Sequence, residues 1–406
     1  MFQRSIYPIL KDALKISPAV LLTGARQVGK STLCLTLDYH YVVFDNLSQR
    51  EAAHNDPIGY IANLPKPVTI DEIQKVPEVL EGIKIDIDKH HRNGDFLLTG
   101  SANVLGMKQA RDTLAGRVIE LHLLPLSAKE LKHKPDENFI DALFKEDIRN
   151  LSVAKVSYEE ILQTILNGGY PQIYTIDSER GKSLWFSSYI STYVERDIRD
   201  VGELRDITAF IKFFNILAPR SCGLLNKSDL ANDSGLSEAT VSNYLSMLEM
   251  IYQISLLKAY SSNISKRFIK SPKLYMSDSG VLAHLLNITT IQELLESNKK
   301  GAIIETFVYN ELLKHINYSM TMPHIYHYRT NDKKEIDFVI EKGDTIIAIE
   351  VKSSHTVKLE SFKYIIDFQK KSSKKVIGLV FYMGEAILPF GDAQYERYAL
   401  PIGALF

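Results

Sequence analysis

A run of eight residues, from Gly24 to Ser31, has the spacing of a phosphate-binding loop. It is followed by Thr32, satisfies G-x-x-x-x-G-K-S/T, and reads Gly24-Ala25-Arg26-Gln27-Val28-Gly29-Lys30-Ser31. Glycines let backbone N–H groups surround phosphates, and the N-terminus of a following helix adds partial positive charge. We expect Lys30 to reach the β- and γ-phosphates and Ser31 to ligate Mg²⁺. The loop therefore predicts a site for ATP with Mg²⁺.

Two carboxylates follow a short apolar run further along the chain. Val68 to Ile70 reads as a buried strand that ends in Asp71 and Glu72. Asp71 at the end of a strand suits a contact to Mg²⁺, and Glu72 could polarise the attacking water. An acidic pair at a strand end can also lie on the protein surface without a function. The phosphate-binding loop upstream favours the functional interpretation, and we count Asp71 among the nucleotide-binding residues.

A third apolar run, Phe96 to Leu98, leads into a polar turn that contains Thr99, Ser101 and Asn103. Ligands of open parallel sheets bind at the carboxyl ends of the strands. Thr99 or Ser101 could therefore sense the γ-phosphate or hold the lytic water. The alternative is a helix N-cap at Ser101 or Asn103.

Three residues near the C-terminus have the layout of D…E-x-K nucleases. Asp337 lies in an alternating run, and Glu350 and Lys352 fall on one face of the next one because side chains alternate along a strand. Glu305, in an upstream helical run, is a fourth candidate. Asp337 and Glu350 could bind Mg²⁺ that activates water, while Lys352 could position the nucleophile or neutralise developing charge. The alternative is a surviving fold that binds without cleaving.

The apolar runs that must position the first three motifs alternate with helical or loop segments. This alternation favours a parallel sheet with crossover helices. The runs are Ala19 to Leu22, Tyr41 to Phe44, Val68 to Ile70, Phe96 to Leu98 and Val118 to Leu124.

The middle of the chain has a helix-turn-helix pattern between Asn226 and Leu245. We expect Ser228 to cap the first helix, Gly235 to supply the turn and Ser237 to cap the second helix. The runs 256–260 and 273–276 could pair as the strands of a wing. Between them lies the basic segment Lys266-Arg267-Phe268-Ile269-Lys270.

Contact of this module with DNA remains open. The small polar side chains on the second helix suit a groove-reading helix, and the basic segment is the most DNA-like patch of the chain. However, residues 237–249 hold no Lys or Arg, although phosphate contacts dominate non-specific affinity. A module for protein interaction or domain packing is the alternative.

The motifs occur in a fixed order with several others. These are Thr23 to Ser31, Ile70 to Gln74, Leu98 to Ala102, Leu114 to Arg117, Leu124 to Ser127 with Glu130, and Tyr193 to Asp197. Over nearly the whole chain, the series resembles the prokaryotic AAA-type ATPases that carry a C-terminal domain of unknown function. The resemblance implies an ATPase domain of the additional-strand, conserved-glutamate class. It also implies a C-terminal domain similar to restriction-endonuclease-like folds.

Arg117 matches the L-A-G-R position of that family. Such an arginine could contact phosphate in cis, or in trans within a homo-oligomer. A surface arginine at a strand edge is the alternative. Arg26 and Arg196 are weaker candidates of the same kind.

We predict an α/β chain of four segments. Residues 1–130 form a P-loop AAA-type ATPase domain with a parallel sheet, and 131–220 form a helical linker region. Residues 221–290 form a winged-helix-like domain, and 291–406 form the nuclease-like D…E-x-K domain.

The overall composition limits the binding partners and the cellular environment that we expect for these domains. The net charge is −1, so attraction to nucleic acid would have to come from a local basic patch. The two cysteines, Cys34 and Cys222, form no metal-ligand pattern and fit a reducing, cytoplasmic setting. No run of 18 apolar residues occurs, so we expect no membrane span.

Two functions are compatible with the motifs. In the first, ATP hydrolysis moves the winged helix and the nuclease-like domain on DNA. In the second, ATP occupancy switches a surface that binds a partner protein, and the nuclease-like fold is catalytically silent.

Overall fold

The computed structural model describes residues 2–100, 114–134, 138–145, 147–194, 198, 206–263, 267, 270–392 and 394–406. Two compact units are present. The first contains residues 1–126 with the segments 191–204 and 250–252, and the second contains the remainder. The four segments expected from the sequence stay a prediction, because one compact unit can hold several domains. The second unit includes residues 127–190 together with the later segments.

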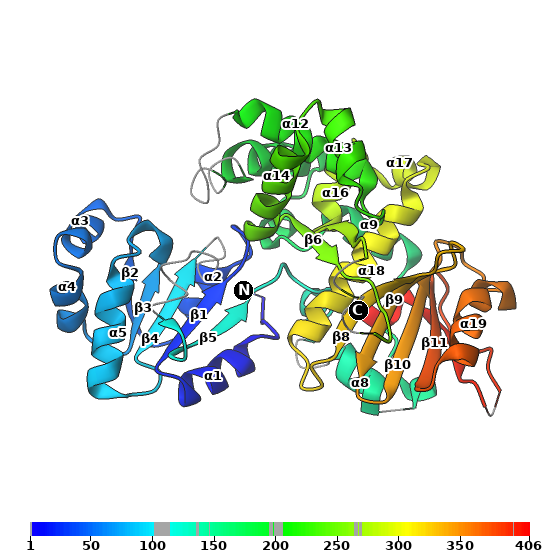
Figure 1. Ribbon diagram of the computed structural model, residues 1–406, viewed down its shortest axis with the longest axis horizontal. Helices are drawn as coiled ribbons and strands as arrows, with labels where there is room; N and C mark the ends of the chain where they lie inside the picture. Colours follow the sequence, from blue (N-terminus) through cyan, green and yellow to red (C-terminus); the bar gives the residue numbers. More distant parts are fainter. Residues whose placement is uncertain are drawn as a thin grey trace. The chain divides into compact units, whose positions relative to one another are not determined.

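The first unit is built on a five-stranded sheet in which all neighbouring strands are parallel (Figure 1). Its order is β2 (His40–Val43), β3 (Val68–Asp71), β4 (Phe96–Gly100), β1 (Ala19–Thr23) and β5 (Val118–His122). The helices are α1 (Tyr7–Ile16), α2 (Lys30–Cys34), α3 (Leu47–Asn55), α4 (Pro57–Asn63) and α5 (Val79–His90), with the turn η1 (Ile73–Lys75). The predicted parallel sheet is confirmed.

Strand β4 lies between β1, which leads into the phosphate-binding loop, and β3, which ends at Asp71. The additional strand that the family resemblance implied is therefore present. Thr99 is level with Leu22 and Leu98 is level with Ile70, so the carboxyl ends of the three strands meet at one edge. Leu21, Ile70 and Leu98 are fully buried in the core of this unit, which fixes the edge rigidly.

The second unit contains a six-stranded mixed sheet. Its order is β12 (Leu388–Pro389), β13 (Arg397–Pro401), β11 (Lys375–Tyr382), β10 (Thr345–Val351), β9 (Glu335–Lys342) and β8 (His324–Arg329). Strands β8, β9 and β10 form an antiparallel meander, and α19 (Lys363–Lys371) then crosses to β11, which runs parallel to β10. Gly343, with a φ of 57°, permits the tight turn between β9 and β10.

Helices cover both faces of this sheet. Ile365 and Phe368 of α19 pack with Val339 in the apolar core of one face. The neighbouring Phe338 stacks on Tyr309 of α18 (Lys300–Asn317), and successive side chains of a strand point to opposite faces. The pairing of β8 with β9 has a register shift beside Asp337, and Lys273 contacts both Asp337 and Glu305, so Asp337 lies near α18.

The other elements of the second unit are mostly helical. They are α7 (Ala128–Leu131), α8 (Phe139–Lys145), η3 (Ile148–Asn150), α9 (Tyr158–Asn167), η4 (Pro171–Thr175), α10 (Glu179–Ser188), α12 (Ile207–Leu217), η6 (Ala218–Arg220), α13 (Lys227–Ser234), α14 (Glu238–Met250), α16 (Ser279–Leu285), α17 (Ile291–Glu296), η7 (Leu359–Phe362) and η8 (Ile402–Leu405). The π-helical segment η5 (Tyr189–Val194) runs from this unit into the first. Among the helices of the described ranges, none is long and apolar enough to cross a membrane.

Helices α13 and α14 occupy the predicted helix-turn-helix positions, and Gly235 ends α13 with a φ of 73°. Ser237 accepts a hydrogen bond from the Thr240 amide, as expected for a cap. The cap predicted at Ser228 is wrong: α13 already begins at Lys227, and the side chain of Asn226 accepts from the amides of Ser228 and Asp229. Strands β6 (Ile254–Leu257) and β7 (Lys273–Met276) pair antiparallel. The winged-helix assignment stays a prediction.

Candidate functional site

The phosphate-binding loop has a backbone that requires its glycines. Gly24 and Gly29 have φ values of 144° and 97°, which side chains other than glycine rarely adopt. A Cβ at Gly24 would lie 2.2 Å from the Leu123 carbonyl oxygen. Arg4 braces the loop, because its guanidinium donates to the carbonyls of Val28 (2.7 Å) and Leu124 (2.6 Å). Sequence reasoning missed Arg4, which lies 20 residues before the loop.

Lys30 folds back over the loop. Its ammonium donates to the carbonyls of Gly24 (2.7 Å) and Ala25 (2.8 Å), and the residue is only 6% exposed. A buried cation inside a ring of backbone groups attracts polyanions strongly, because little water screens it. The loop therefore fits a nucleotide triphosphate chain.

Asp71 is the centre of a polar network at the ends of the strands. The Ser31 hydroxyl donates to its Oδ2 at 2.8 Å, and the Tyr41 hydroxyl bonds to the same atom. The Thr99 hydroxyl and the Glu72 amide donate to its Oδ1. Hydroxyl and carboxylate oxygens side by side are ligands that Mg²⁺ prefers, so Ser31 and Asp71 fit the predicted metal. Burial and the bond to Asp71 raise the pKa of Tyr41 above its usual range.

Sequence reasoning missed Tyr41. It stands one residue after the start of β2, level with Thr69 on β3. A tyrosine in a short strand otherwise reads as a packing residue. Only the pairing of β2 with β3 brings its hydroxyl to Asp71.

Glu72 has a left-handed backbone, with a φ of 61°, which is unusual outside glycine and is often found at functional sites. Gln74 donates to its carboxylate, and the Arg26 guanidinium lies 3.9 Å away. The predicted base is thus held by two side chains. Arg26 comes from inside the phosphate-binding loop, so the loop and Glu72 are in direct electrostatic contact.

Arg117 does not reach the loop within one chain. It precedes β5, whose first residue pairs with Ala19 at the start of β1, so it lies at the opposite edge of the sheet. Five residues of strand span roughly 16 Å. Arg117 instead makes a two-point ion pair with Asp88, at 2.7 and 2.9 Å. A catalytic contact in cis is therefore excluded, and a contact in trans needs a second copy of the chain. Ser101, Asn103 and Arg196 lie outside the described residues.

His122 lies beside the loop and was not predicted. Its Nδ1 is 3.3 Å from the hydroxyl of Thr23, which precedes Gly24. Burial, followed by the Lys30 ammonium, lowers the pKa of His122 to about 4. Tyr252 packs on the ring at 4.2 Å between centroids. The ring is thus neutral at pH 7 and adds no positive charge beside Lys30.

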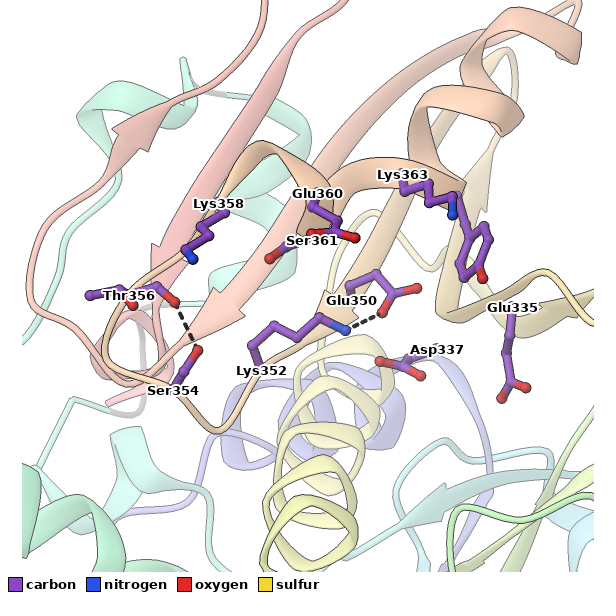
Figure 2. Close-up of a pocket in the computed structure, with 11 residues that line it drawn as sticks. Glu335, Asp337, Glu350, Lys352, Ser354, Thr356, Lys358, Glu360, Ser361 and Lys363 are labelled. Carbon is purple, nitrogen blue, oxygen red and sulfur yellow. Dashed lines mark hydrogen bonds and ion pairs between the residues drawn. The ribbon is translucent and has the colours of Figure 1, made fainter.

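In the second unit, the structure brings Asp337, Glu350 and Lys352 together around a pocket of about 600 Å³ (Figure 2). The Asp337 carboxylate accepts from the Val351 amide at 2.9 Å, and Lys352 donates to Glu350 at 2.9 Å. Two further carboxylates, two further lysines and four hydroxyl side chains line the remainder of the pocket: Glu335, Glu360, Lys358, Lys363, Ser354, Thr356, Ser361 and Tyr364. Its walls are polar.

A lysine that sequence reasoning missed lies inside the carboxylate cluster. Lys273 of β7 is 2% exposed, and its ammonium is 3.2 Å from Glu305, 2.6 Å from Glu335 and 3.5 Å from Asp337. The Tyr275 hydroxyl donates to Glu305 at 2.7 Å. The only sequence signal was a charged residue at the head of an apolar four-residue strand.

The metal site of Asp337 and Glu350 stays a prediction, and the carboxylate cluster beside it is occupied by an ammonium. Within the described ranges, no three His, Cys, Asp or Glu side chains are placed to hold a metal ion. An ammonium stands among the carboxylates instead. Burial, and then the charge of Asp337, raise the pKa of Glu305 to about 7 and that of Glu350 to about 8. Burial lowers the pKa of Lys273, but the carboxylates, Glu305 first, outweigh this and keep it above its usual range.

The basic wing segment is described only at Arg267 and Lys270, and Lys266, Phe268 and Ile269 lie outside the described residues. Arg267 pairs with Glu341 at 2.7 Å and lies over the ring of Tyr260 at 4.7 Å. This arginine is thus engaged within its own unit. Contact of the basic segment with DNA stays a prediction.

Three family models match the chain. Residues 17–132 match a model described as an AAA domain. Residues 158–292 and 300–405 match two domains of unknown function, DUF8612 and DUF4143.

Several relatives with uncharacterized function are similar to most of the chain. Rv2008c of Mycobacterium tuberculosis is 27% identical over 389 residues, which cover 94% of this chain and 80% of that protein. A protein of Haemophilus influenzae is 27% identical and covers 74% of this chain and 70% of its own length. Among solved structures, the Walker-type ATPase PABY2304 of Pyrococcus abyssi has 16% identity and a TM-score of 0.45, covering 70% of this chain and 96% of that one. The AAA domain match supports a P-loop ATPase as the first unit of this chain.

Proposed function

We propose that the first unit hydrolyses ATP with Mg²⁺. The observation that carries the proposal is the hydrogen bond between the Ser31 hydroxyl and the Asp71 carboxylate. This bond stands at the meeting point of the phosphate-binding loop and the strand that leads to Glu72. A binding loop without such an acidic partner would explain nucleotide binding but not turnover.

Each residue of the site has its own role in ATP hydrolysis. Lys30 exchanges its two loop carbonyls for phosphate oxygens and neutralises their charge. Ser31 and Asp71 would hold Mg²⁺, which would offset the charge that develops on the phosphates. Glu72 accepts the proton of the attacking water. Its contacts with Gln74 and Arg26 must loosen for this, so that a carboxylate oxygen can reach the water.

The substitution Lys30→Ala tests the binding step. We expect loss of nucleotide binding by at least tenfold, because the buried cation of the loop is removed. Titration with a fluorescent ATP analogue measures it, and Lys89→Ala, an exposed lysine at the end of α5, is the matched control. Equal affinity of Lys30→Ala and the control would remove Lys30 from the site.

For the second unit, we infer a nucleotide-controlled binding surface for a partner protein. The observation that favours it over DNA cleavage is the carboxylate cluster, which does not fit a metal in this arrangement. Helix α14 also presents no Lys or Arg between residues 238 and 249, and Arg267 is already paired. Co-purification tests this proposal: a stoichiometric protein partner without salt-sensitive DNA retention supports it.

Metal-dependent cleavage of DNA is the competing candidate. Asp337, Glu350 and Lys352 around one polar pocket favour it. Incubation of the full chain with DNA, Mg²⁺ or Mn²⁺ and ATP decides between the two. Cleavage that Asp337→Asn abolishes would establish the nuclease and end the proposal of a silent fold.

A further inference from the structure

We propose that Lys273 is the resident cation of the carboxylate cluster and excludes a divalent metal ion from it. The ammonium lies within 3.5 Å of carboxylate oxygens from three residues, one on α18 and two on β9. A metal ion bridging Glu305 and Asp337 would bind the same carboxylates that Lys273 already pairs with. The inference does not depend on ATP hydrolysis by the first unit.

Charge repulsion makes the two occupants mutually exclusive. Lys273 is almost fully buried, so water screens its charge little. A divalent ion placed among the same oxygens would meet an unscreened positive charge at contact distance. Conversely, removal of the ammonium would leave three carboxylates close together and unbalanced, which favours any cation that can enter.

The backbone of Lys273 is held by neighbouring segments on both sides. Lys273 pairs with Leu257 of β6 on one side and forms a bridge to Leu224 on the other. The next residue, Leu274, exchanges two hydrogen bonds with the Cys222–Gly223 segment, at 2.7 and 2.9 Å. These pairings fix the backbone of Lys273, while burial and the three ion pairs hold its side chain. The cation is therefore a fixed part of the fold.

Lys352 differs from Lys273 in each of these respects. Its side chain is 39% exposed, lines the pocket and pairs with Glu350. In Figure 2, Lys352 and Glu350 point toward each other from the end of β10. A lysine at this place can respond to a ligand in the pocket, whereas Lys273 sets the charge of the cluster behind it.

Mn²⁺ binding to the full-length, nucleotide-free chain tests the proposal. All proteins carry Ser31→Ala, so that the first unit contributes no metal site. Electron paramagnetic resonance counts the bound Mn²⁺. In the protein with native Lys273, we expect that adding Asp337→Asn does not change the amount of bound Mn²⁺. With Lys273→Met, we expect one added Mn²⁺ per chain, bound at least about tenfold more tightly than to the Lys273 protein, and lost again in Lys273→Met/Asp337→Asn.

Two further variants separate charge from packing. Lys273→Arg keeps a cation in the cluster and is expected to bind no added Mn²⁺. Lys270→Met removes a lysine of the same segment, one that lies outside the cluster and is exposed, and is likewise expected to bind none.

Either of two results would overturn the proposal. One is a Mn²⁺ site in the protein with native Lys273 that Asp337→Asn abolishes. The site itself would be seen without any Lys273 variant, which could misfold. The other is a folded Lys273→Met protein, verified by circular dichroism, that gains no Mn²⁺. ATP turnover of Lys273→Met with native Ser31 is measured in parallel, so failure of the ATPase proposal would be recognised separately.

Discussion

Two buried lysines, Lys30 and Lys273, show how residues of one type acquire different roles from their partners. Lys30 donates to main-chain carbonyls of the phosphate-binding loop. Carbonyl oxygens carry no net charge, so phosphate oxygens can replace them favourably. Lys273 contacts three carboxylates, and no such exchange is favourable there, because full negative charges would lose their counter-ion. Lys30 is suited to bind a ligand, and Lys273 to exclude one.

Tyr41 provides a prediction at the residue scale. Its hydroxyl bonds to Asp71 beside Ser31, so it orients the carboxylate toward the metal position. In Tyr41→Phe, loss of about 1 kcal/mol of orientation would raise the Mg²⁺ concentration for half-maximal ATP turnover by about fivefold. Turnover measured against Mg²⁺ concentration checks this, with Tyr39→Phe as the control on the same segment. An unchanged Mg²⁺ dependence in Tyr41→Phe would contradict the role.

The motifs of the first unit could be predicted from the sequence because each is contiguous. The glycines, Lys30 and Ser31 lie within eight residues, and Asp71 and Glu72 end one strand. Arg4, Tyr41 and His122 could not be predicted as site residues. Arg4 precedes α1, Tyr41 lies on β2 and His122 on β5, and each reaches the site only through strand order and packing.

In the second unit, too, the residues within one hairpin could be predicted from the sequence, but a residue from a distant element could not. Alternation along the strands was enough to place Asp337, Glu350 and Lys352 around one pocket. The ammonium that changes the chemistry of the cluster comes from β7, 62 residues before Glu335 at the start of β9. No spacing rule connects Lys273 with these residues, because β7 reaches them by packing between elements and belongs to a different sheet.

At the scale of elements, α18 organises the second unit by carrying charged and polar groups into its core. Glu305 reaches the carboxylate cluster, and Glu311 accepts from the Ala128 amide of α7 at 2.9 Å. His315, near the end of the helix, is 5% exposed, and its Nδ1 faces the Phe139 amide of α8 at 3.4 Å. The helix thus ties the sheet to the segments that precede it, and it depends on His315 being neutral.

This dependence predicts acid sensitivity. Burial, and then the ammonium groups of Lys129 and Lys314, lower the pKa of His315 to about 3, against about 6.5 in the unfolded chain. Between these values the unfolded state binds the proton and the folded state does not. His315 therefore destabilises the fold as the pH falls below about 6.5, by about 2 kcal/mol at pH 5.

The variant His315→Gln isolates the effect. Its free energy of unfolding should fall less steeply than that of the wild type between pH 6.5 and 4, as measured by urea unfolding followed by circular dichroism. The exposed His324→Gln on β8 is the control, and its profile should follow the wild type. Parallel profiles for all three proteins would refute the assignment.

At the scale of the whole molecule, the chain passes from the second unit back to the first at the end of α14. Helix α14 ends at Met250, and Met250 to Tyr252 belong to the first unit. Tyr252 packs on His122, close to the start of the phosphate-binding loop. A short stretch of chain thus connects Tyr252, which packs beside the phosphate-binding loop, to α14. A nucleotide-controlled switch requires such a connection.

Hydrogen exchange tests this coupling. A non-hydrolysable ATP analogue should slow amide exchange in the phosphate-binding loop, and it should also change exchange in α14, which lies in the second unit. Tyr252→Ala should keep the first change and lose the second, because the packing on His122 is removed. Changes confined to the first unit in the wild type would count against the switch.

The substitution Glu72→Gln tests the central claim, ATP hydrolysis by the first unit, most directly. The amide has the same shape as the carboxylate but cannot take a proton from water, and general base catalysis contributes about 10²–10⁴-fold. We predict that Glu72→Gln binds ATP with an affinity like that of the wild type, while its turnover number falls at least about 100-fold. A turnover number close to that of the wild type, in a protein that binds ATP normally, would contradict the account.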